Sequence, residues 1–164
     1  MIEFDMRKND CPLCGATVDI PVDMPTVMAD MPKLISRSFR EPRSHEGLGW
    51  TPHEVASHLA DVEVVLGWRI RQVLAEDEPT LQPFDQDVWA AKLFYGQREL
   101  ATSLSTYAAN RQSNLELLRF AGDASLERGY RHPEFGNRPL RLLVEHIADH
   151  DILHLRQIRG ESAN

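Results

Sequence analysis

The spacing of the apolar residues limits the fold more than any other feature, because they recur every three to four positions along most of the chain. Such spacing is typical of amphipathic helices, whereas half-buried strands alternate apolar and polar residues. No segment alternates convincingly, so we expect strands to be absent or minor. The pattern predicts four principal helices at about residues 24–40, 52–76, 98–121 and 139–159, with a shorter helical stretch between 84 and 95. It therefore predicts an all-α fold, an antiparallel four-helix bundle, with a structured loop at 122–138.

The composition fits one ordinary globular domain. The chain has 164 residues, of which 42% are apolar and 26% charged, so it is long enough to bury a core and is not a disordered chain. A net charge of −7 argues against a nucleic-acid-binding surface. No apolar run reaches the roughly 18–20 residues of a membrane span, the first residues lack a signal-peptide pattern, and two cysteines make no disulfide framework. We therefore expect a cytoplasmic protein without nucleic-acid or membrane partners, with an N-terminal extension at 1–23 and a bundle domain at 24–160.

The second predicted helix has a strong start signal. Thr51 can cap the helix, Pro52 suits its first position, and Glu54 completes a capping box. Asp85 is a candidate cap for the shorter helical stretch, and Gly122 and Gly160 follow two of the predicted helix ends. These signals fix the predicted boundaries of the helices.

Three histidines, His146, His150 and His154, recur every four residues in the last predicted helix. Residues at i and i+4 lie about 5–6 Å apart on one face of a helix, close enough for two imidazoles to bind one divalent ion. On a helical wheel, His150 and His154 lie on the apolar stripe with Leu143 and Ile147, and His146 lies on its flank. His146 and His154 are about 12 Å apart along the helix axis, which is too far for both to reach one ion comfortably. A third ligand is therefore expected from another helix.

His58 is the best candidate for that third ligand. It lies on the apolar face of the second helix with Val55 and Val62, whereas Glu63 and Gly67 point away on the wheel. A single histidine on an apolar face is more often a core residue satisfied by a hydrogen bond. A pair at i and i+4 together with a third from a different helix favours a metal site, built from inward-facing side chains of neighbouring helices. Three imidazoles that leave one coordination position open are typical of a catalytic site.

Charged residues near the histidines are expected to orient ligands, to cap helices or to extend to solvent, and not to bind the metal themselves. Asp61, one turn from His58, is the best candidate to orient a ligand imidazole. Asp149 and Asp151 lie about 100° from His150 on the wheel, so we expect solvated or capping roles for them. Arg69 shares the inward face of His58 and could bind an anionic substrate group, but extension to solvent at the helix end is the simpler expectation.

Several segments resemble one known family. The segment Trp50-Thr-Pro-His-Glu-Val-Ala-Ser-His58-Leu-Ala-Asp61 is similar to the second-helix signature of the DinB/YfiT-like superfamily of metal-dependent enzymes. The stretch from Phe84 to Trp89 resembles its acidic and aromatic connector, and His132-Pro-Glu-Phe-Gly136 with His150-Asp-Ile-Leu-His154-Leu-Arg-Gln157 resembles its closing segment. The resemblance covers about residues 25–160.

The resemblance carries specific implications. It implies an up-down-down-up four-helix bundle, commonly a homodimer, and a divalent metal ion (zinc, nickel, iron or manganese) held by three histidines. Those histidines correspond to His58, His150 and His154 of this chain. It also implies a small-molecule substrate and reactions that transfer low-molecular-weight thiols such as bacillithiol or mycothiol.

The N-terminal extension departs from that family pattern. Cys11-Pro-Leu-Cys14-Gly resembles one knuckle of a zinc ribbon, but a second ligand pair is missing. His45 or His53, or the same motif of a partner subunit, could complete such a site. A redox pair and inert reduced cysteines are the alternatives.

Two functional hypotheses follow. The first is a metal-dependent enzyme, a transferase of a small thiol or a hydrolase, in which the metal activates the thiol or a water molecule. The second is a non-catalytic dimeric metal-binding bundle that acts as a stress-associated interaction protein.

Overall fold

The structure, a computed structural model, describes residues 24–39 and 49–160 and is mainly helical. Its four long helices are α1 (Met24–Ser38), α2 (Pro52–Ala75), α4 (Leu100–Ala121) and α5 (Leu140–Ile158). The shorter elements are α3 (Gln86–Lys92), the 3-10 turns η2 (Tyr95–Gln97) and η3 (Asp123–Glu127), and the strands β1 (Gly129–His132) and β2 (Gly136–Pro139). The predicted all-α bundle is confirmed. Cys11, Cys14 and His45 lie outside the described residues.

The predicted helix caps form at the positions that the sequence indicates. The Thr51 hydroxyl accepts a hydrogen bond from the Glu54 amide, and the Glu54 carboxylate accepts one from the Thr51 amide at 2.8 Å. The Asp85 carboxylate caps α3 by accepting from the amides of Asp87 and Val88. Gly122 ends α4 with φ at +75°, a left-handed value that favours glycine. The strongest of these caps begins the helix that carries His58.

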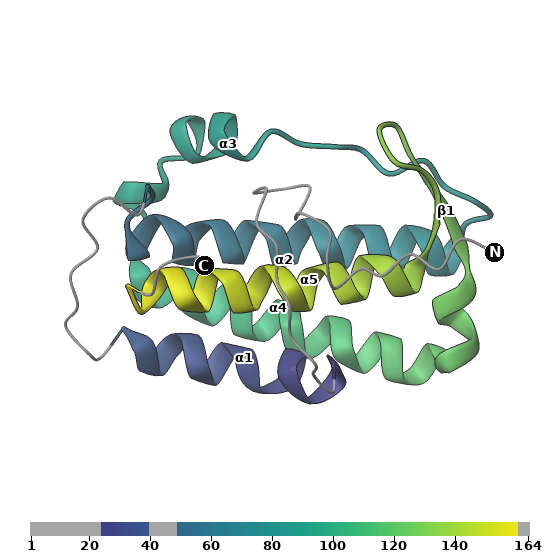
Figure 1. Cartoon of the computed structure of the whole chain (residues 1–164), viewed down its shortest axis with the longest axis horizontal. Coiled ribbons are helices and arrows are strands. Elements are labelled where there is room, and N and C mark those ends of the chain that lie inside the picture. The colour runs from purple at the N-terminus through teal and green to yellow at the C-terminus, as the bar shows by residue number, and fades with distance from the viewer. Residues whose placement is uncertain (1–23, 40–48, 161–164) are drawn as a thin grey trace.

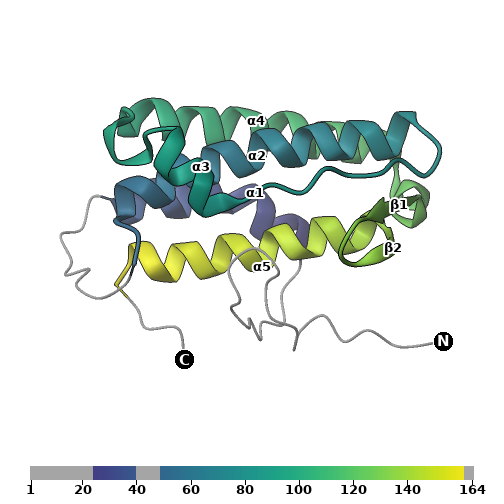
Figure 2. The ribbon, with the colours of Figure 1, turned by 90° about the horizontal axis from the view of Figure 1, so that it is seen from above.

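The helices follow an up-down-down-up order (Figure 1). α1 and α5 run in one direction, and α2 and α4 run in the other, so α2 and α4 are parallel neighbours. Helix spacing alone predicts an antiparallel bundle and leaves the order of the helices open, whereas the up-down-down-up order implied by the family resemblance is confirmed. Because α2 and α4 are parallel, residues 76–99 must return along the whole bundle. From above, this crossover lies along the seam between α2 and α5 (Figure 2).

Residues 122–138, predicted as a structured loop, contain a short antiparallel hairpin. In it, Tyr130 pairs with Arg138 and His132 pairs with Gly136. Each strand has only four residues, which is too short to show an alternating pattern in the sequence. Leu81 of the crossover donates its amide hydrogen to the Arg131 carbonyl at 2.9 Å, so the hairpin anchors the far end of the crossover.

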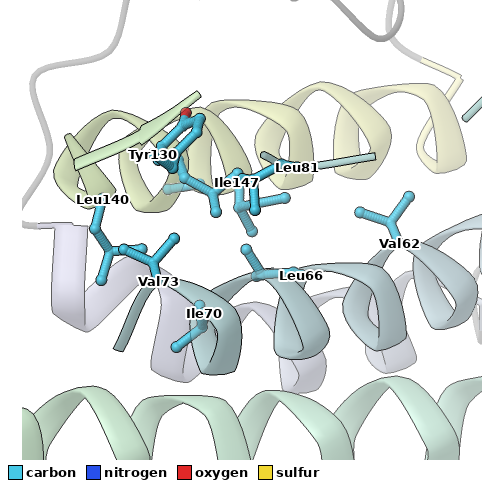
Figure 3. Close-up of a cluster of buried hydrophobic side chains, with 10 residues drawn as sticks. Val62, Leu66, Ile70, Val73, Leu81, Tyr130, Leu140 and Ile147 are labelled. Carbon is cyan, nitrogen blue, oxygen red and sulfur yellow. The ribbon is translucent and has the colours of Figure 1, made fainter. Parts of the chain in front are cut away.

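Two apolar clusters hold the helices together. One lies toward the hairpin, where α2 side chains point at α5 and at Tyr130 (Figure 3); it contains Val62, Leu66, Ile70, Val73, Leu81, Tyr130, Leu140, Leu143, Ile147 and Ala148. The other lies toward the opposite end and contains Met31, Ile35, Val55, Leu59, Ala60, Tyr107, Leu155 and Ile158. None of the described helices combines the length and apolar content needed to cross a membrane. Buried polar side chains of α2, α4 and α5 form a polar layer, which contains His58, Glu63, Arg111, His150, Asp151 and His154.

Candidate metal centre

The three histidines singled out from the sequence meet in this polar layer. His58 comes from α2, and His150 and His154 lie one turn apart on α5. The Nε2 atom of His150 is 3.0 Å from Nε2 of His58 and 3.1 Å from Nε2 of His154. All three side chains are buried, and one ligand atom of each lies within 4.8 Å of the others. The geometry is therefore that of three nitrogen atoms around one point.

Hydrogen bonding by Gln157 orients the ring of His154. The Gln157 Nε2 group donates to the Trp50 carbonyl at 3.4 Å, which leaves its Oε1 to accept from Nδ1 of His154 at 2.9 Å. His154 then carries its proton on Nδ1 and presents the lone pair of Nε2 to the centre. A glutamine at i+3 thus fixes the tautomer that a metal ligand needs.

Neutral imidazoles alone leave this centre poorly satisfied. The His150 Nε2 atom faces two other Nε2 atoms, but a neutral ring has one proton to share with one of them. At least one of the two contacts at about 3 Å therefore lacks a directed hydrogen bond, and a cation between the nitrogen atoms would satisfy both. The arrangement of the donor atoms therefore fits a divalent ion.

Burial keeps the three rings neutral. It lowers the pKa of His58 and of His150 well below the usual value, with a smaller contribution from the neighbouring imidazoles. Burial also lowers the pKa of His154 to about 4, against the opposing effect of the bond to Gln157. Because only the neutral ring offers a lone pair, three rings that stay unprotonated at neutral pH are ready to bind a cation.

Two aromatic rings lie close to the ring of His58. The Trp50 ring meets the His58 ring edge-on with centroids 4.9 Å apart, and the Tyr95 ring lies 6.3 Å away. Tyr95 belongs to η2 at the end of the crossover, and its carbonyl accepts a hydrogen bond from Ser57 at 3.0 Å. Asp61, predicted to orient His58, instead pairs with Arg98 at 2.8 Å. That prediction is wrong because the crossover brings a competing cation to Asp61.

His146 lies beside the centre but outside the cluster. Its ring centroid is 6.3 Å from that of His150, and the group of converging ligand atoms does not include it. Burial and the charge of Arg69 lower its pKa to about 4. The expectation that His146 is a neighbour of the site agrees with this position. His53, the other histidine considered as a partner for the cysteines, contacts the Arg98 carbonyl.

A buried ion-pair network on the α4 side of the layer was missed in the sequence. Arg111 of α4 donates to Asp151 of α5 at 2.6 Å and to Glu63 of α2 at 2.7 Å, and all three side chains are about 1% exposed. Asn114 donates to Glu63 at 2.9 Å. Burial by itself lowers the pKa of Arg111, but Asp151, Tyr107 and Glu63 outweigh it and hold that pKa well above the usual value. The predictions that Glu63 points away and that Asp151 is solvated are wrong, because both face α4.

Arg69 is also not where the sequence suggested. It is only 8% exposed rather than extended to solvent. Its Nη2 atom donates to the Gln82 carbonyl at 2.6 Å, and its Cζ atom lies 5.8 Å from the centre of the Phe84 ring. Both partners belong to the crossover, which covers this end of α2 and keeps Arg69 from solvent.

The fold and the buried triad define a class of four-helix bundle with a three-histidine candidate metal centre on α2 and α5. The profile of the DinB superfamily matches residues 37–158. The chain belongs to this superfamily.

Relatives and a solved structure agree with that membership. A protein of Oceanobacillus iheyensis named "Putative metal-dependent hydrolase OB0782" is 28% identical over 135 residues, which cover 79% of this chain and 78% of the relative. YfiT of Bacillus subtilis, named in the same way, is 24% identical over 146 residues, which cover 86% of this chain and 81% of YfiT. The solved structure of YfiT, described as a probable metal-dependent hydrolase with an unusual four-helix bundle topology, matches with a TM-score of 0.77 and 20% identity over 91% of this chain and 93% of YfiT. This likeness shows the shared fold.

Proposed function

We propose that this chain is a metal-dependent enzyme whose divalent ion is held by His58, His150 and His154. The observation that carries the proposal is the convergence of three buried Nε2 atoms, with His150 3.0 and 3.1 Å from its two partners. Three protein ligands leave room for a fourth, exchangeable one, which is typical of catalytic centres. The names of the relatives, which call them metal-dependent hydrolases, support the same interpretation.

The surrounding residues have separable roles in this proposal. An ion at the triad supplies Lewis-acid chemistry, lowering the pKa of a water molecule or a thiol into the neutral range. Gln157 holds the proton of His154 on Nδ1, which keeps the Nε2 lone pair available. The Trp50 and Tyr95 rings exclude water from one side of His58. Arg111 ties α2 and α5 to α4 through Glu63 and Asp151, which holds the helices that carry the ligands in register.

Two reactions fit such a centre. In metal-assisted hydrolysis, water adds to an ester or amide carbon, the bond to the leaving group breaks, and the leaving group takes up a proton. In the alternative, the sulfur of a low-molecular-weight thiol forms a new bond to an electrophilic carbon, the bond from that carbon to the leaving group breaks, and the thiol proton goes to the leaving group. The names of the relatives support hydrolysis, and the family resemblance supports thiol transfer. In both cases the substrate is a small molecule.

Metal analysis of the purified full chain tests the ligand set. We expect about one divalent ion per chain, zinc, nickel, iron or manganese, and loss of most of it in His58→Ala and in His150→Ala. His132→Ala is the matched control, since this histidine lies in the hairpin and is absent from the converging group. Full metal content in His58→Ala and His150→Ala would contradict the proposed site.

An activity screen separates the two reactions and the non-catalytic alternative. Metal-loaded protein is offered ester and amide substrates in water, and electrophilic substrates together with cysteine, bacillithiol or mycothiol. We expect turnover that His150→Ala abolishes and that Arg119→Gln, an exposed change on α4, retains. Turnover only in the presence of a thiol identifies a transferase, and turnover without one identifies a hydrolase. Metal binding without turnover in either arm supports a dimeric binding protein instead.

We also propose a homodimer, as the family resemblance implies. In support, Val64 and Trp68 lie one turn apart on α2 and are 52% and 62% exposed, more than large apolar side chains favour in water. Sedimentation velocity of the full chain tests this proposal. We expect a dimer that Trp68→Lys shifts toward monomer, whereas a wild-type monomer at micromolar concentration contradicts it.

A further inference from the structure

Arg69 is a buried cation with no counter-ion among residues 24–39 and 49–160. It is 8% exposed, and no carboxylate within the described part of the chain lies at ion-pair distance from it. Its Nη2 atom has one carbonyl partner, Gln82, and its Nε atom is buried without a partner. Arg111, the other buried arginine, has two carboxylate partners. Since an uncompensated buried charge is costly, the contrast indicates that the counter-charge of Arg69 comes from a ligand.

The surroundings of Arg69 suit an anion that carries an apolar body. The guanidinium lies beside the Phe84 ring, which in turn packs on the Trp89 ring with centroids 4.7 Å apart. Its charge also lowers the pKa of His146 and of His132, in each case after burial as the larger cause. Arginine presents several N–H donors in one plane, an arrangement that binds both oxygens of a carboxylate or two oxygens of a phosphate.

Arg69 and the histidine triad lie along one seam of the bundle. The crossover connects them, because Gln82 and Phe84 contact Arg69 while Tyr95, farther along the same segment, lies against His58. Figure 2 shows this segment following the seam between α2 and α5. His146 lies in the same seam, one helical turn from His150.

Helix geometry gives the scale of the separation. α2 rises about 16 Å between the Cα atoms of His58 and Arg69. Since long helical side chains tend to lean toward the N-terminus, we expect the guanidinium to lie nearer the triad than its Cα atom. We estimate roughly 10 Å from the guanidinium to the centre of the triad.

We propose that Arg69 is a substrate-binding residue that holds an oxyanion, a carboxylate or phosphate group, at the end of a substrate whose reacting bond lies at the His58–His150–His154 centre. The inference rests on the proposed metal-dependent function and adds the substrate class. The substrate is an elongated anion with its charged group roughly 10 Å from the bond that reacts. Neutral molecules of the same shape are poorer substrates.

Calorimetric titration of the full metal-loaded chain with benzoate, and separately with inorganic phosphate, tests this inference. We expect saturable one-to-one binding of at least one of them, weakened tenfold or more in Arg69→Gln. Arg69→Lys keeps the positive charge but loses the planar donor set, so a smaller weakening is expected. Arg119→Gln removes an exposed arginine from α4 and serves as the matched control with unchanged binding. The anion with the larger loss identifies the group as carboxylate or phosphate.

Each other outcome has a defined meaning. No saturable binding of either anion to the wild-type chain, or equal binding by wild type and Arg69→Gln, overturns the inference. Binding that is lost in His150→Ala but kept in Arg69→Gln also overturns it, because the anion then binds at the triad. Metal content measured on the same samples reports the proposed function independently. An Arg69→Gln chain with full metal and unweakened anion binding refutes the subsite alone, and a wild-type chain without metal refutes the enzyme.

Discussion

The two buried arginines differ in what surrounds them, and their substitutions should differ accordingly. Arg111→Leu leaves Glu63 and Asp151 buried without a cation, so we expect a loss of about 3–5 kcal/mol in the free energy of unfolding. Arg69→Gln removes a charge that no carboxylate of the described residues compensates, so we expect the free energy of unfolding to change by less than about 1 kcal/mol. Urea unfolding of both variants measures this, with exposed Arg119→Leu as control. Similar losses at positions 69 and 111 would show that Arg69 has a counter-charge within the protein.

Gln157 should affect metal affinity more than stability. Gln157→Leu removes the acceptor for the Nδ1 proton of His154, which is then free to move to Nε2 and block the lone pair. Loss of such an outer partner weakens metal binding about 10- to 100-fold. Competition with a chromophoric chelator measures the affinity, and Gln112→Leu, exposed on α4, is the control. Unchanged affinity in Gln157→Leu means that other contacts set the tautomer of His154.

At the scale of elements, α2 and α4 approach closely at Gly67. A Cβ atom there would lie 2.6 Å from Oδ1 of Asn114. Asn114 cannot move away freely, because Arg71 donates to its Oδ1 atom at 2.9 Å and its Nδ2 group donates to Glu63. This glycine therefore permits the contact between the two parallel helices.

Gly67→Ala should consequently destabilise the protein, although alanine is the better helix former by about 1 kcal/mol. Overpacking of this kind costs about 1–3 kcal/mol, so we expect a net loss of roughly 1 kcal/mol in urea unfolding. Gly96→Ala is the control, because the nearest atom to its Cβ would be Oε1 of Glu54 at an ordinary 3.6 Å. A stabilised Gly67→Ala chain would show that α4 yields easily at Asn114.

Sequence predictions that depend on neighbouring residues or on one clear apolar face are confirmed. Capping residues such as Thr51 and Asp85 bond to residues two or three positions away, so these helix starts could be predicted from the neighbouring sequence alone. His58, His150 and His154 could be found because they lie on clear apolar stripes. Glu63 could not, because a helical wheel assumes one buried face. Two faces of α2 are buried, one against α5 at His58 and the other against α4 at Glu63. On the second face, Arg111 and Asn114 donate hydrogen bonds to the Glu63 carboxylate.

At the scale of the whole molecule, the order of the helices could not be derived from periodicity. Every helix has an apolar stripe whether its neighbour is parallel or antiparallel, so the stripes do not disclose direction. A parallel arrangement of α2 and α4 requires a connection that returns along the bundle, and residues 76–99 are long enough to do so. The burial of Arg69 could not be predicted for the same reason, because this segment covers its side chain.

The whole bundle should survive removal of its metal. Two separate apolar clusters already hold α2 against α5, so the triad is not needed to bring these helices together. We expect a chelator to lower Tm by about 5–10 °C, the effect of an ion present at about 100 times its Kd, while the helical circular dichroism at 25 °C is unchanged. Added metal should restore the original Tm. Unfolding at 25 °C on chelation would instead indicate a structural ion.

The contact between His58 and His150 spans 92 positions of the chain. During synthesis, α2 and α4 leave the ribosome before α5 exists, and the growing chain then carries only one of the three imidazoles. A single imidazole holds a divalent ion weakly and discriminates poorly between ions. The choice of ion therefore falls to the finished bundle, after α5 has docked, and not to the nascent polypeptide.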